Sequence, residues 1–254
     1  MSNAIDIKDL SFSYGKHLVL DKVNTCFPEN QFSILLGVNG GGKSTLFKIL
    51  SGLIDGFSGN IRFFGEEYHQ LSRKERAKQI GFLSQNFTTI FPFSVQEILL
   101  TGRSAFSRFD YNKDDLQRVQ AIAEKTHITH LLPKSFASLS GGQQQLVMIA
   151  RVLVQNPRII LLDEPTNHLD IFHQHHLLKT LKSLTEDQYT VVAIMHNPSL
   201  AFQYADNIYY LYRNKIMQNS TGKTPDLELL KEIFSVDFFY HEQDERSFLT
   251  SLPF

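Results

Sequence analysis

Residues 37–45 read Gly37-Val38-Asn39-Gly40-Gly41-Gly42-Lys43-Ser44-Thr45 and match the phosphate-loop pattern G-x-x-x-x-G-K-S/T. The apolar run 32–36 before the loop predicts a buried strand, and residues 44–53 after it carry apolar side chains at helical spacing. Glycines allow a loop to turn its backbone N–H groups inward, and the following helix adds the positive end of its dipole. In this strand–loop–helix context a chance match is a minor alternative, so the loop predicts a site for nucleotide phosphates.

The last residues of the loop have the chemistry that phosphate binding needs. We expect Lys43 to reach the β- and γ-phosphates and the Ser44 hydroxyl to ligate Mg²⁺. Taken alone, the loop predicts an ATP or GTP site with Mg²⁺ as cofactor.

Two carboxylates follow the apolar run 158–162, which predicts another buried strand. Open parallel sheets bind ligands at the carboxyl ends of their strands, and neighbouring strand residues point in different directions. We therefore expect Asp163 to hold Mg²⁺ through water and Glu164 to orient the attacking water. Alone, such a pair could equally be solvated or cap the next helix. His196 follows the apolar run 190–195 and is predicted at the same edge.

Strands alternating with helices run through most of the chain and predict an α/β fold with a parallel sheet. Further strands are expected at residues 5–7, 12–14, 59–65, 79–84 and 207–212. Helices are expected at residues 94–102, 114–127, 144–154, 172–184 and 198–204. Residues 225–254 begin with an amphipathic pattern and end in a mixed tail. With no long linker and no internal repeat, we expect residues 1–254 to form one domain.

Composition and charge narrow the classes of partner. The 25 Lys and Arg residues nearly balance the 26 Asp and Glu residues, so the formal net charge is −1. That balance gives no global attraction to nucleic acid, and no nucleic-acid partner is expected. The N-terminus lacks the pattern of a secretory signal, so we expect the chain to stay in the cytoplasm. The densest aliphatic run, 159–162, is far short of the ~20 apolar residues that cross a bilayer.

The segment Leu139-Ser140-Gly141-Gly142-Gln143 precedes a predicted helix and offers a hydroxyl and exposed N–H groups to an anion, with a plain helix cap as the alternative. This segment resembles the LSGGQ signature of ATP-binding-cassette (ABC) proteins. The resemblance extends over almost the whole chain. Its elements, in the order of that family, are Tyr14, residues 37–45, Gln85, residues 139–143, Asp163-Glu164, Asn167-His168-Leu169-Asp170 and His196.

The resemblance implies an ABC ATPase fold: a P-loop NTPase core with a parallel sheet, an N-terminal antiparallel β subdomain, and a helical subdomain inserted at about residues 86–155. It also implies roles for single residues. Tyr14 would stack on adenine, and Gln85 would sense Mg²⁺ and the γ-phosphate. Asp170 would help to organise a partner's site, and His196 would contact the γ-phosphate. Without the family, these could be an edge-strand tyrosine, an ordinary loop residue, a helix cap and a structural histidine.

The family also implies a head-to-tail dimer, either of two copies or with a closely related cassette subunit. ATP would lie between the phosphate loop of one chain and the segment Ser140–Gln143 of the other. Closure around both nucleotides would produce a mechanical stroke that moves membrane partners.

One stretch, residues 86–103, resembles the importers of iron–siderophore complexes, haem and cobalamin. The supporting features are Phe-Pro-Phe-Ser-Val at 91–95, Gly102-Arg103, Gln143-Gln144-Gln145 and Thr166-Asn167-His168-Leu169-Asp170. Phe87, Phe91 and Phe93 could form an apolar patch for a helix of a membrane subunit, or could pack locally.

Such a subunit would be bound to polytopic permease subunits at the cytoplasmic face of the inner membrane, with an extracytoplasmic solute-binding protein upstream. The alternatives are a soluble ABC ATPase without a transport role and the motor subunit of an exporter. Two departures from the family pattern are Asn197, where aspartate is common, and Val38, where proline is frequent.

Overall fold

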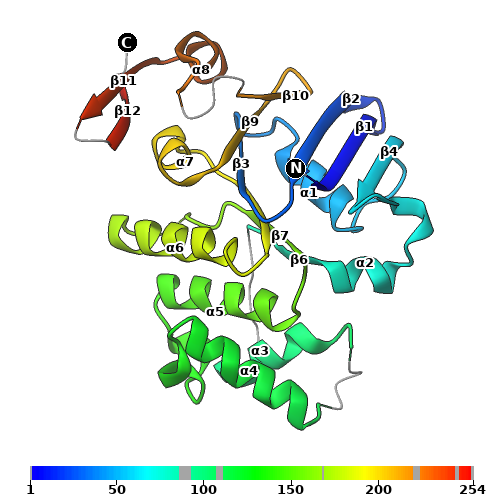
Figure 1. Cartoon of the computed structure of the whole chain (residues 1–254), viewed down its shortest axis with the longest axis vertical. Coiled ribbons are helices and arrows are strands. Elements are labelled where there is room, and N and C mark those ends of the chain that lie inside the picture. The colour runs from blue at the N-terminus through cyan, green and yellow to red at the C-terminus, as the bar shows by residue number, and fades with distance from the viewer. Residues whose placement is uncertain are drawn as a thin grey trace.

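The computed structural model describes residues 2–85, 93–106, 111–167, 169–219, 224–243 and 246–252 (Figure 1). Within these residues the centre of the fold is a six-stranded sheet with the strand order β10-β9-β3-β8-β7-β6. Its strands are β3 (Phe32–Leu36), β6 (Ile80–Leu83), β7 (Ile159–Asp163), β8 (Thr190–Ile194), β9 (Asn207–Tyr212) and β10 (Lys215–Gln218). The five strands from β9 to β6 are parallel, and β10 is antiparallel to β9. Every residue of β3, β7 and β8 is buried, as expected for strands covered on both faces.

A second, antiparallel sheet contains the N-terminus, with the order β2-β1-β4-β5. Its strands are β1 (Asn3–Tyr14), β2 (His17–Pro28), β4 (Ser58–Phe63) and β5 (Glu66–Glu67). Helix α1 (Lys43–Leu50) lies between the two sheets, because its buried Leu46, Phe47, Ile49 and Leu50 share one hydrophobic core with residues of both. The predicted α/β class, with a parallel sheet and an N-terminal antiparallel sheet, is confirmed.

Helices cover the other face of the parallel sheet and continue into a second hydrophobic core. Helices α5 (Gly141–Val154), α6 (Ile171–Leu184) and α7 (Pro198–Tyr204) contact the sheet, and α3 (Val95–Leu100) and α4 (Lys113–Lys125) pack on α5. Figure 1 shows α3, α4 and α5 gathered at the end of the molecule away from the antiparallel sheet. These three helices fall within the range 86–155 that the sequence assigns to a helical subdomain.

The remaining elements are short or lie near the C-terminus. Helix α2 (Arg73–Gln79) leads into β6, and 3-10 turns occur at η1 (Tyr68–Gln70), η2 (Thr101–Arg103), η3 (Thr129–Leu131) and η4 (Phe136–Ser138). Helix α8 (Leu227–Phe234) is followed by the hairpin β11 (Asp237–Gln243) and β12 (Arg246–Leu252). The hairpin packs on α7 through Leu249, which is buried and whose carbonyl accepts a hydrogen bond from Ser199. None of the helices in the described ranges is long and apolar enough to cross a bilayer.

The strand order determines where the site forms. Strands β3, β8, β7 and β6 are parallel neighbours, so their carboxyl ends meet at one edge of the sheet. That edge therefore collects the phosphate loop after β3, His196 after β8, the two carboxylates at the end of β7 and Gln85 after β6. Ligands of open parallel sheets bind at this kind of edge.

Candidate functional site

The phosphate loop connects β3 to α1 and depends on glycine at both ends. Gly37 has φ +152°, and a Cβ atom there would lie 2.5 Å from the carbonyl oxygen of Leu211. Gly42 precedes the first residue of α1 with φ +100°, and its Cβ would lie 2.7 Å from Cγ1 of Val19. Both positions exclude any larger residue unless the backbone shifts. The chain itself therefore holds the loop in its curved shape.

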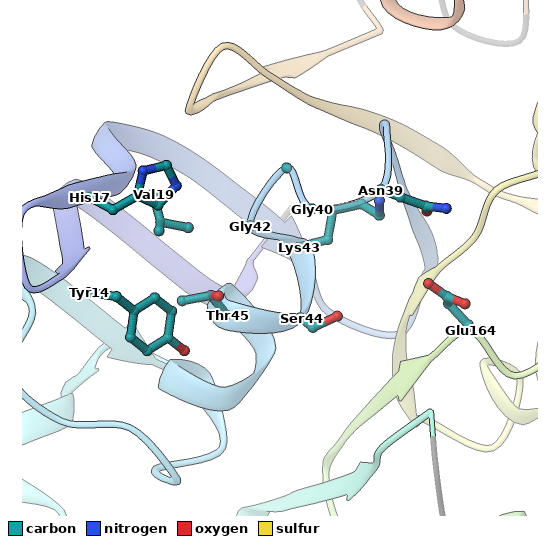
Figure 2. A pocket seen from close by; sticks show the side chains of 11 residues that line it. Tyr14, His17, Val19, Asn39, Gly40, Gly42, Lys43, Ser44, Thr45 and Glu164 are labelled. Carbon is teal, nitrogen blue, oxygen red and sulfur yellow. The ribbon is translucent and has the colours of Figure 1, made fainter.

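The phosphate loop faces a pocket on the surface of the chain. It is lined by Tyr14, His17, Val19, residues 39–45 and Glu164. Figure 2 shows Tyr14 and His17 on one side of the loop and Glu164 on the opposite side. The cavity is about 230 Å³, smaller than the roughly 300–1,000 Å³ of pockets that enclose a small molecule.

Lys43 lies beneath the loop and is only 5% exposed. Its ammonium donates hydrogen bonds to the carbonyl oxygens of Gly37 and Val38, each at 2.8 Å. Burial lowers the pKa of Lys43, and the negative charges of Glu164 and Asp163 oppose that decrease. The ammonium is therefore held in the loop by neutral acceptors, and a phosphate would give it an anionic partner.

Asp163 is also buried, at 4% exposure, and its Oδ1 atom has no hydrogen-bond partner within the described ranges. Burial raises the pKa of Asp163, and a hydrogen bond from the Ser44 side chain opposes this increase. An unpartnered buried carboxylate oxygen beside a hydroxyl is a suitable pair of oxygen ligands for a hard cation. Nowhere in the described residues do three or more His, Cys, Asp or Glu form a metal-binding group. The residues thus fit Mg²⁺, which binds one or two protein oxygens together with phosphates and water.

Glu164 begins the loop after β7 in a left-handed conformation, with φ +56°. Such a backbone is strained for a non-glycine residue and is concentrated at functional sites. The Glu164 carboxylate accepts a hydrogen bond from Nε2 of Gln85 at 2.5 Å. It also contacts Nδ2 of Asn167 and Nε2 of His196. The structure therefore brings three predicted residues, Glu164, Gln85 and His196, into direct contact beside the loop.

Across the loop from Glu164, the pocket is lined by Tyr14, which the sequence predicts, and by two residues that it does not predict. Tyr14 is 49% exposed and its ring contacts Phe12 edge-on, with centroids 4.9 Å apart. His17 and Val19 also line the pocket. Both lie on β2, and His17 pairs with Tyr14 across the hairpin turn. Recognising β2 as the partner of β1 would have placed them here.

The segment Ser140–Gln143 forms the start of α5 and does not line the pocket. Ser140 and Gln143 make a capping box, in which the Ser140 hydroxyl accepts from the Gln143 N–H at 3.4 Å and the Gln143 side chain accepts from the Ser140 N–H at 3.2 Å. Ser140 and Gly141 are exposed. Gly142 faces α6, where a Cβ atom would lie 3.2 Å from Cδ2 of His173. Ser140 therefore caps α5, as the alternative interpretation predicts, and Ser140 and Gly141 remain exposed to solvent.

Asp170 caps the N-terminus of α6 and is exposed. Its carboxylate accepts from the His173 N–H at 2.9 Å and contacts His173 Nδ1 at 2.8 Å. The first of these hydrogen bonds is the main cause of the lowered pKa of Asp170. The next two residues, Ile171 and Phe172, are large apolar side chains that are about three-quarters exposed. His168 lies outside the described residues.

Other features of the sequence have structural explanations. Gly102 allows close packing, because a Cβ there would lie 2.3 Å from the carbonyl oxygen of Arg151. Arg103 forms an ion pair at 2.7 Å with buried Asp115. Asn197 caps α7 by accepting from the Leu200 N–H at 3.3 Å. Of the predicted phenylalanine patch, Phe87 and Phe91 lie outside the described residues, and Phe93 is 43% exposed.

Comparison with known proteins gives consistent results. The family model for ABC transporters matches residues 20–167. The ferric enterobactin transport ATP-binding protein FepC of Escherichia coli K12 is 37% identical over 235 residues, covering 90% of this chain and 86% of the relative. The hemin import ATP-binding protein HmuV of Aliivibrio fischeri is 37% identical and covers 85% of this chain and 83% of the relative. The petrobactin import ATP-binding protein FpuD of Bacillus anthracis is 32% identical, with coverages of 93% and 88%.

Solved structures resemble the chain over nearly its full length. An ABC transporter assigned to the metal-chelate type, in an inward-facing conformation, has a subunit that matches with a TM-score of 0.87 and 30% identity. That match covers 100% of this chain and 98% of the other. A bacterial ABC transporter cassette solved as a dimer matches with a TM-score of 0.72 and 29% identity, covering 84% of this chain and 96% of the other.

Proposed function

The chain belongs to the ABC transporter family, and from this membership we propose that it is the ATP-binding and ATP-hydrolysing subunit that powers an importer of iron–siderophore, haem or cobalamin-type metal chelates. The observation that carries the proposal is the Glu164 carboxylate, which lines the phosphate-loop pocket and is held there by Gln85, Asn167 and His196. Relatives at 32–37% identity are named as ferric enterobactin, hemin and petrobactin transport proteins, which supports the class of substrate.

In the proposed reaction, each residue at the sheet edge has a separate task. Residues 37–45 bind the phosphates of ATP through backbone N–H groups, and Lys43 exchanges its two carbonyl acceptors for phosphate oxygens. Ser44 and Asp163 would hold Mg²⁺, with Gln85 sensing the metal. Bound there, Mg²⁺ would neutralise charge on the β- and γ-phosphates. Glu164 orients and deprotonates the attacking water, His196 contacts the γ-phosphate, and Tyr14 stacks on adenine.

We place a second chain over the open pocket. Ser140, Gly141, Gly142 and Gln143 form a helix start that contributes nothing to the pocket of their own chain. In a head-to-tail dimer, each chain would offer this segment to the nucleotide of the other, and Asp170 would help to organise the partner's site. A cassette at 29% identity that was solved as a dimer supports the association of two chains.

The proposed partners follow from the names of the relatives, which are transport or import ATP-binding proteins. We propose that the chain binds peripherally to polytopic permease subunits at the cytoplasmic face of the inner membrane. A solute-binding protein on the other side would deliver the metal chelate. Dimer closure on ATP would then move the permease.

The substitution Glu164→Gln tests the assigned base. The variant should bind ATP normally and accumulate as an ATP-bound dimer, because the amide keeps the shape of the side chain and cannot take a proton. Its turnover should fall by about 100-fold or more. Size-exclusion chromatography with ATP and a phosphate-release assay measure both effects. Glu228→Gln, on the exposed side of α8, is the matched control. Unchanged turnover in Glu164→Gln would refute the assignment.

Uptake measurements test the substrate class and the direction of transport. Cells should accumulate a radiolabelled ferric siderophore, haem or cobalamin only with the intact gene, and the Glu164→Gln variant should not restore uptake. Faster loss of a labelled compound from cells that carry the gene would instead indicate an exporter. Purification of the chain without any polytopic membrane protein would favour a soluble ATPase.

A further inference from the structure

Within the described part of the chain, the Glu164 carboxylate has three hydrogen-bonding neighbours, and two of them come from distant parts of the sequence. Gln85 follows β6 and His196 follows β8, 79 and 32 residues away in sequence. Gln85 Nε2 and Asn167 Nδ2 both contact Oε2, whereas His196 Nε2 contacts Oε1. The two carboxylate oxygens therefore have different surroundings.

Asn167 differs from the other two neighbours because its own backbone is fixed to Glu164. Its N–H donates to the Glu164 carbonyl oxygen at 3.2 Å, which closes a short turn. Helix α6 supports this turn, because Gln174 Nε2 donates to the carbonyl oxygens of Leu169 at 3.1 Å and Thr166 at 3.4 Å. Asn167 is therefore tied to Glu164 by local contacts, whereas Gln85 and His196 follow other strands of the sheet.

Among the described residues, the charged and titratable groups that interact with Glu164 are Lys43 on α1, Asp163 on β7 and His196 after β8. Asn167 adds a donor to this group without adding a charge. An amide on Oε2 fixes the rotation of the carboxylate and leaves Oε1 as the oxygen that can accept a proton once His196 moves. In the proposed reaction, Gln85 turns to Mg²⁺ and His196 turns to the γ-phosphate. Asn167 is then the one of these three neighbours to which the proposed reaction assigns no contact with Mg²⁺ or the γ-phosphate.

We propose that Asn167 is a positioning residue: it holds Oε2 of Glu164 within its own chain, so that Oε1 faces the attacking water after Gln85 and His196 have turned to the nucleotide. The proposal rests on the proposed function, because it takes Glu164 as the base. Its effect should therefore appear in turnover and not in nucleotide binding.

Asn167→Ala is the first test, made on the purified full chain with ATP and Mg²⁺. Loss of the amide should lower kcat about tenfold, the rate equivalent of about 1.4 kcal/mol. KM for ATP and the Kd of a fluorescent ATP analogue should stay unchanged. Asn60→Ala, at an exposed position on β4, is the matched control and should keep wild-type kcat. A wild-type kcat in Asn167→Ala would overturn the proposal, as would an equal change in nucleotide Kd.

Asn167→Asp is the second test and has nearly the same shape as the native residue. It replaces the donor with a second carboxylate, and two adjacent carboxylates resist joint ionisation. The acid side of the kcat–pH profile should therefore move to higher pH, and further than in Asn167→Ala, which only removes a hydrogen bond from the ionised Glu164 carboxylate. An unmoved profile in Asn167→Asp would mean that the side chain does not reach Glu164, and would overturn the proposal.

The double variant separates this proposal from the proposed function. If Asn167 acts through Glu164, then Glu164→Gln and Glu164→Gln with Asn167→Ala should have the same residual turnover. A further tenfold loss in the double variant would overturn the positioning role and leave Glu164 as the base. Full turnover in Glu164→Gln alone would refute the base, whatever Asn167 does.

Discussion

Two glycine-containing segments, residues 37–42 and 140–142, each lead into a helix, but their surroundings differ. In the first, Gly37 and Gly42 would clash with Leu211 and Val19 if they carried a Cβ atom. In the second, a Cβ atom on Gly141 would have nothing within 4 Å in the described part of the chain, and its φ is not left-handed. The chain itself therefore requires glycine in the phosphate loop, whereas it does not require glycine at position 141.

The same difference extends to the polar groups around each segment. Lys43 is buried against carbonyl oxygens of its own loop, and Glu164 has three donors from its own chain. Ser140 is exposed, and among the described contacts its hydroxyl is bonded only to the Gln143 N–H of its own capping box. In the proposed dimer, one half of the site is thus assembled within a chain, and the other half is presented outward. The difference supports a site completed by a second copy.

A mixing experiment with two inactive variants is the strongest test of this comparison. Lys43→Ala should lose ATP binding by about 100-fold, because it removes charge-assisted hydrogen bonds to phosphate. Gly141→Arg should bind ATP as a single chain but block the partner, while keeping the Ser140 cap. Each variant alone should have almost no turnover. An equal mixture should recover about a quarter of wild-type turnover, because half of the dimers are mixed and each has one intact site.

Phosphate release from the mixture, against Lys179→Ala on the exposed side of α6 as control, measures this recovery. A mixture no more active than its separate components would show that the two segments do not meet across chains. The proposed division of the site between the phosphate loop of one chain and the Ser140–Gln143 segment of its partner would then be wrong.

Matched glycine-to-alanine variants sharpen the comparison at single positions. Gly42→Ala should destabilise the folded chain by about 3 kcal/mol and abolish ATP binding, because of its positive φ and the contact with Val19. Gly141→Ala should change stability by less than about 0.5 kcal/mol, since its site is open. It should bind ATP and lose only turnover. Urea unfolding and nucleotide titration measure both variants, and equal destabilisation by the two would contradict the distinction.

The sequence predicts those parts of the fold in which an apolar run ends at a turn. Strands β3 and β9 and helix α7 match their predicted ranges, β8 differs by one residue at one end, and β7 is shifted by one residue at both ends. In contrast, β1 was expected as two short pieces, because its register shifts and the positive φ of Asp9 break the alternation of buried side chains. Helix α2 has no apolar periodicity and begins at the capping box of Ser72 and Glu75.

Site residues were predicted where a sequence motif specifies both the residue type and its position after a strand. The loop, Glu164 and His196 lie at the sheet edge that their strands predict. His17 and Val19 were missed because β2 was missed, and β2 has its own positive φ at Lys22. The contact from Asn167 to Glu164 depends on the left-handed φ of Glu164, which turns the chain back on itself. No spacing rule in the sequence specifies that conformation.

The smallest expected effect concerns the free-energy cost of burying the Asp163 carboxyl group. Burial raises the pKa of its carboxyl group, so the folded state disfavours the ionised form. At low pH the Asp163 carboxyl group is protonated in both the folded and the unfolded chain, and its burial carries no such cost. The folded chain loses this stability as pH rises through the pKa of the folded state. Asparagine stays neutral, so Asp163→Asn should stabilise the nucleotide-free chain by about 1 kcal/mol at pH 7. The gain should shrink as pH falls through the raised pKa of Asp163.

Urea unfolding from pH 8 to pH 5 measures this gain, with Asp187→Asn in the exposed ion pair with Lys125 as control. The control should change stability by less than about 1 kcal/mol at every pH. Asp163→Asn should also lose the extra stabilisation that Mg²⁺ adds to ATP, because Oδ1 is the buried oxygen without a protein partner among the described residues. A variant that is no more stable than wild type at pH 7, or that keeps the Mg²⁺ effect, would contradict this account. In that case burial of the Asp163 carboxylate would not reduce the stability of the folded chain. The phosphate-loop half of the proposed site would then be no more constrained than the Ser140–Gln143 half.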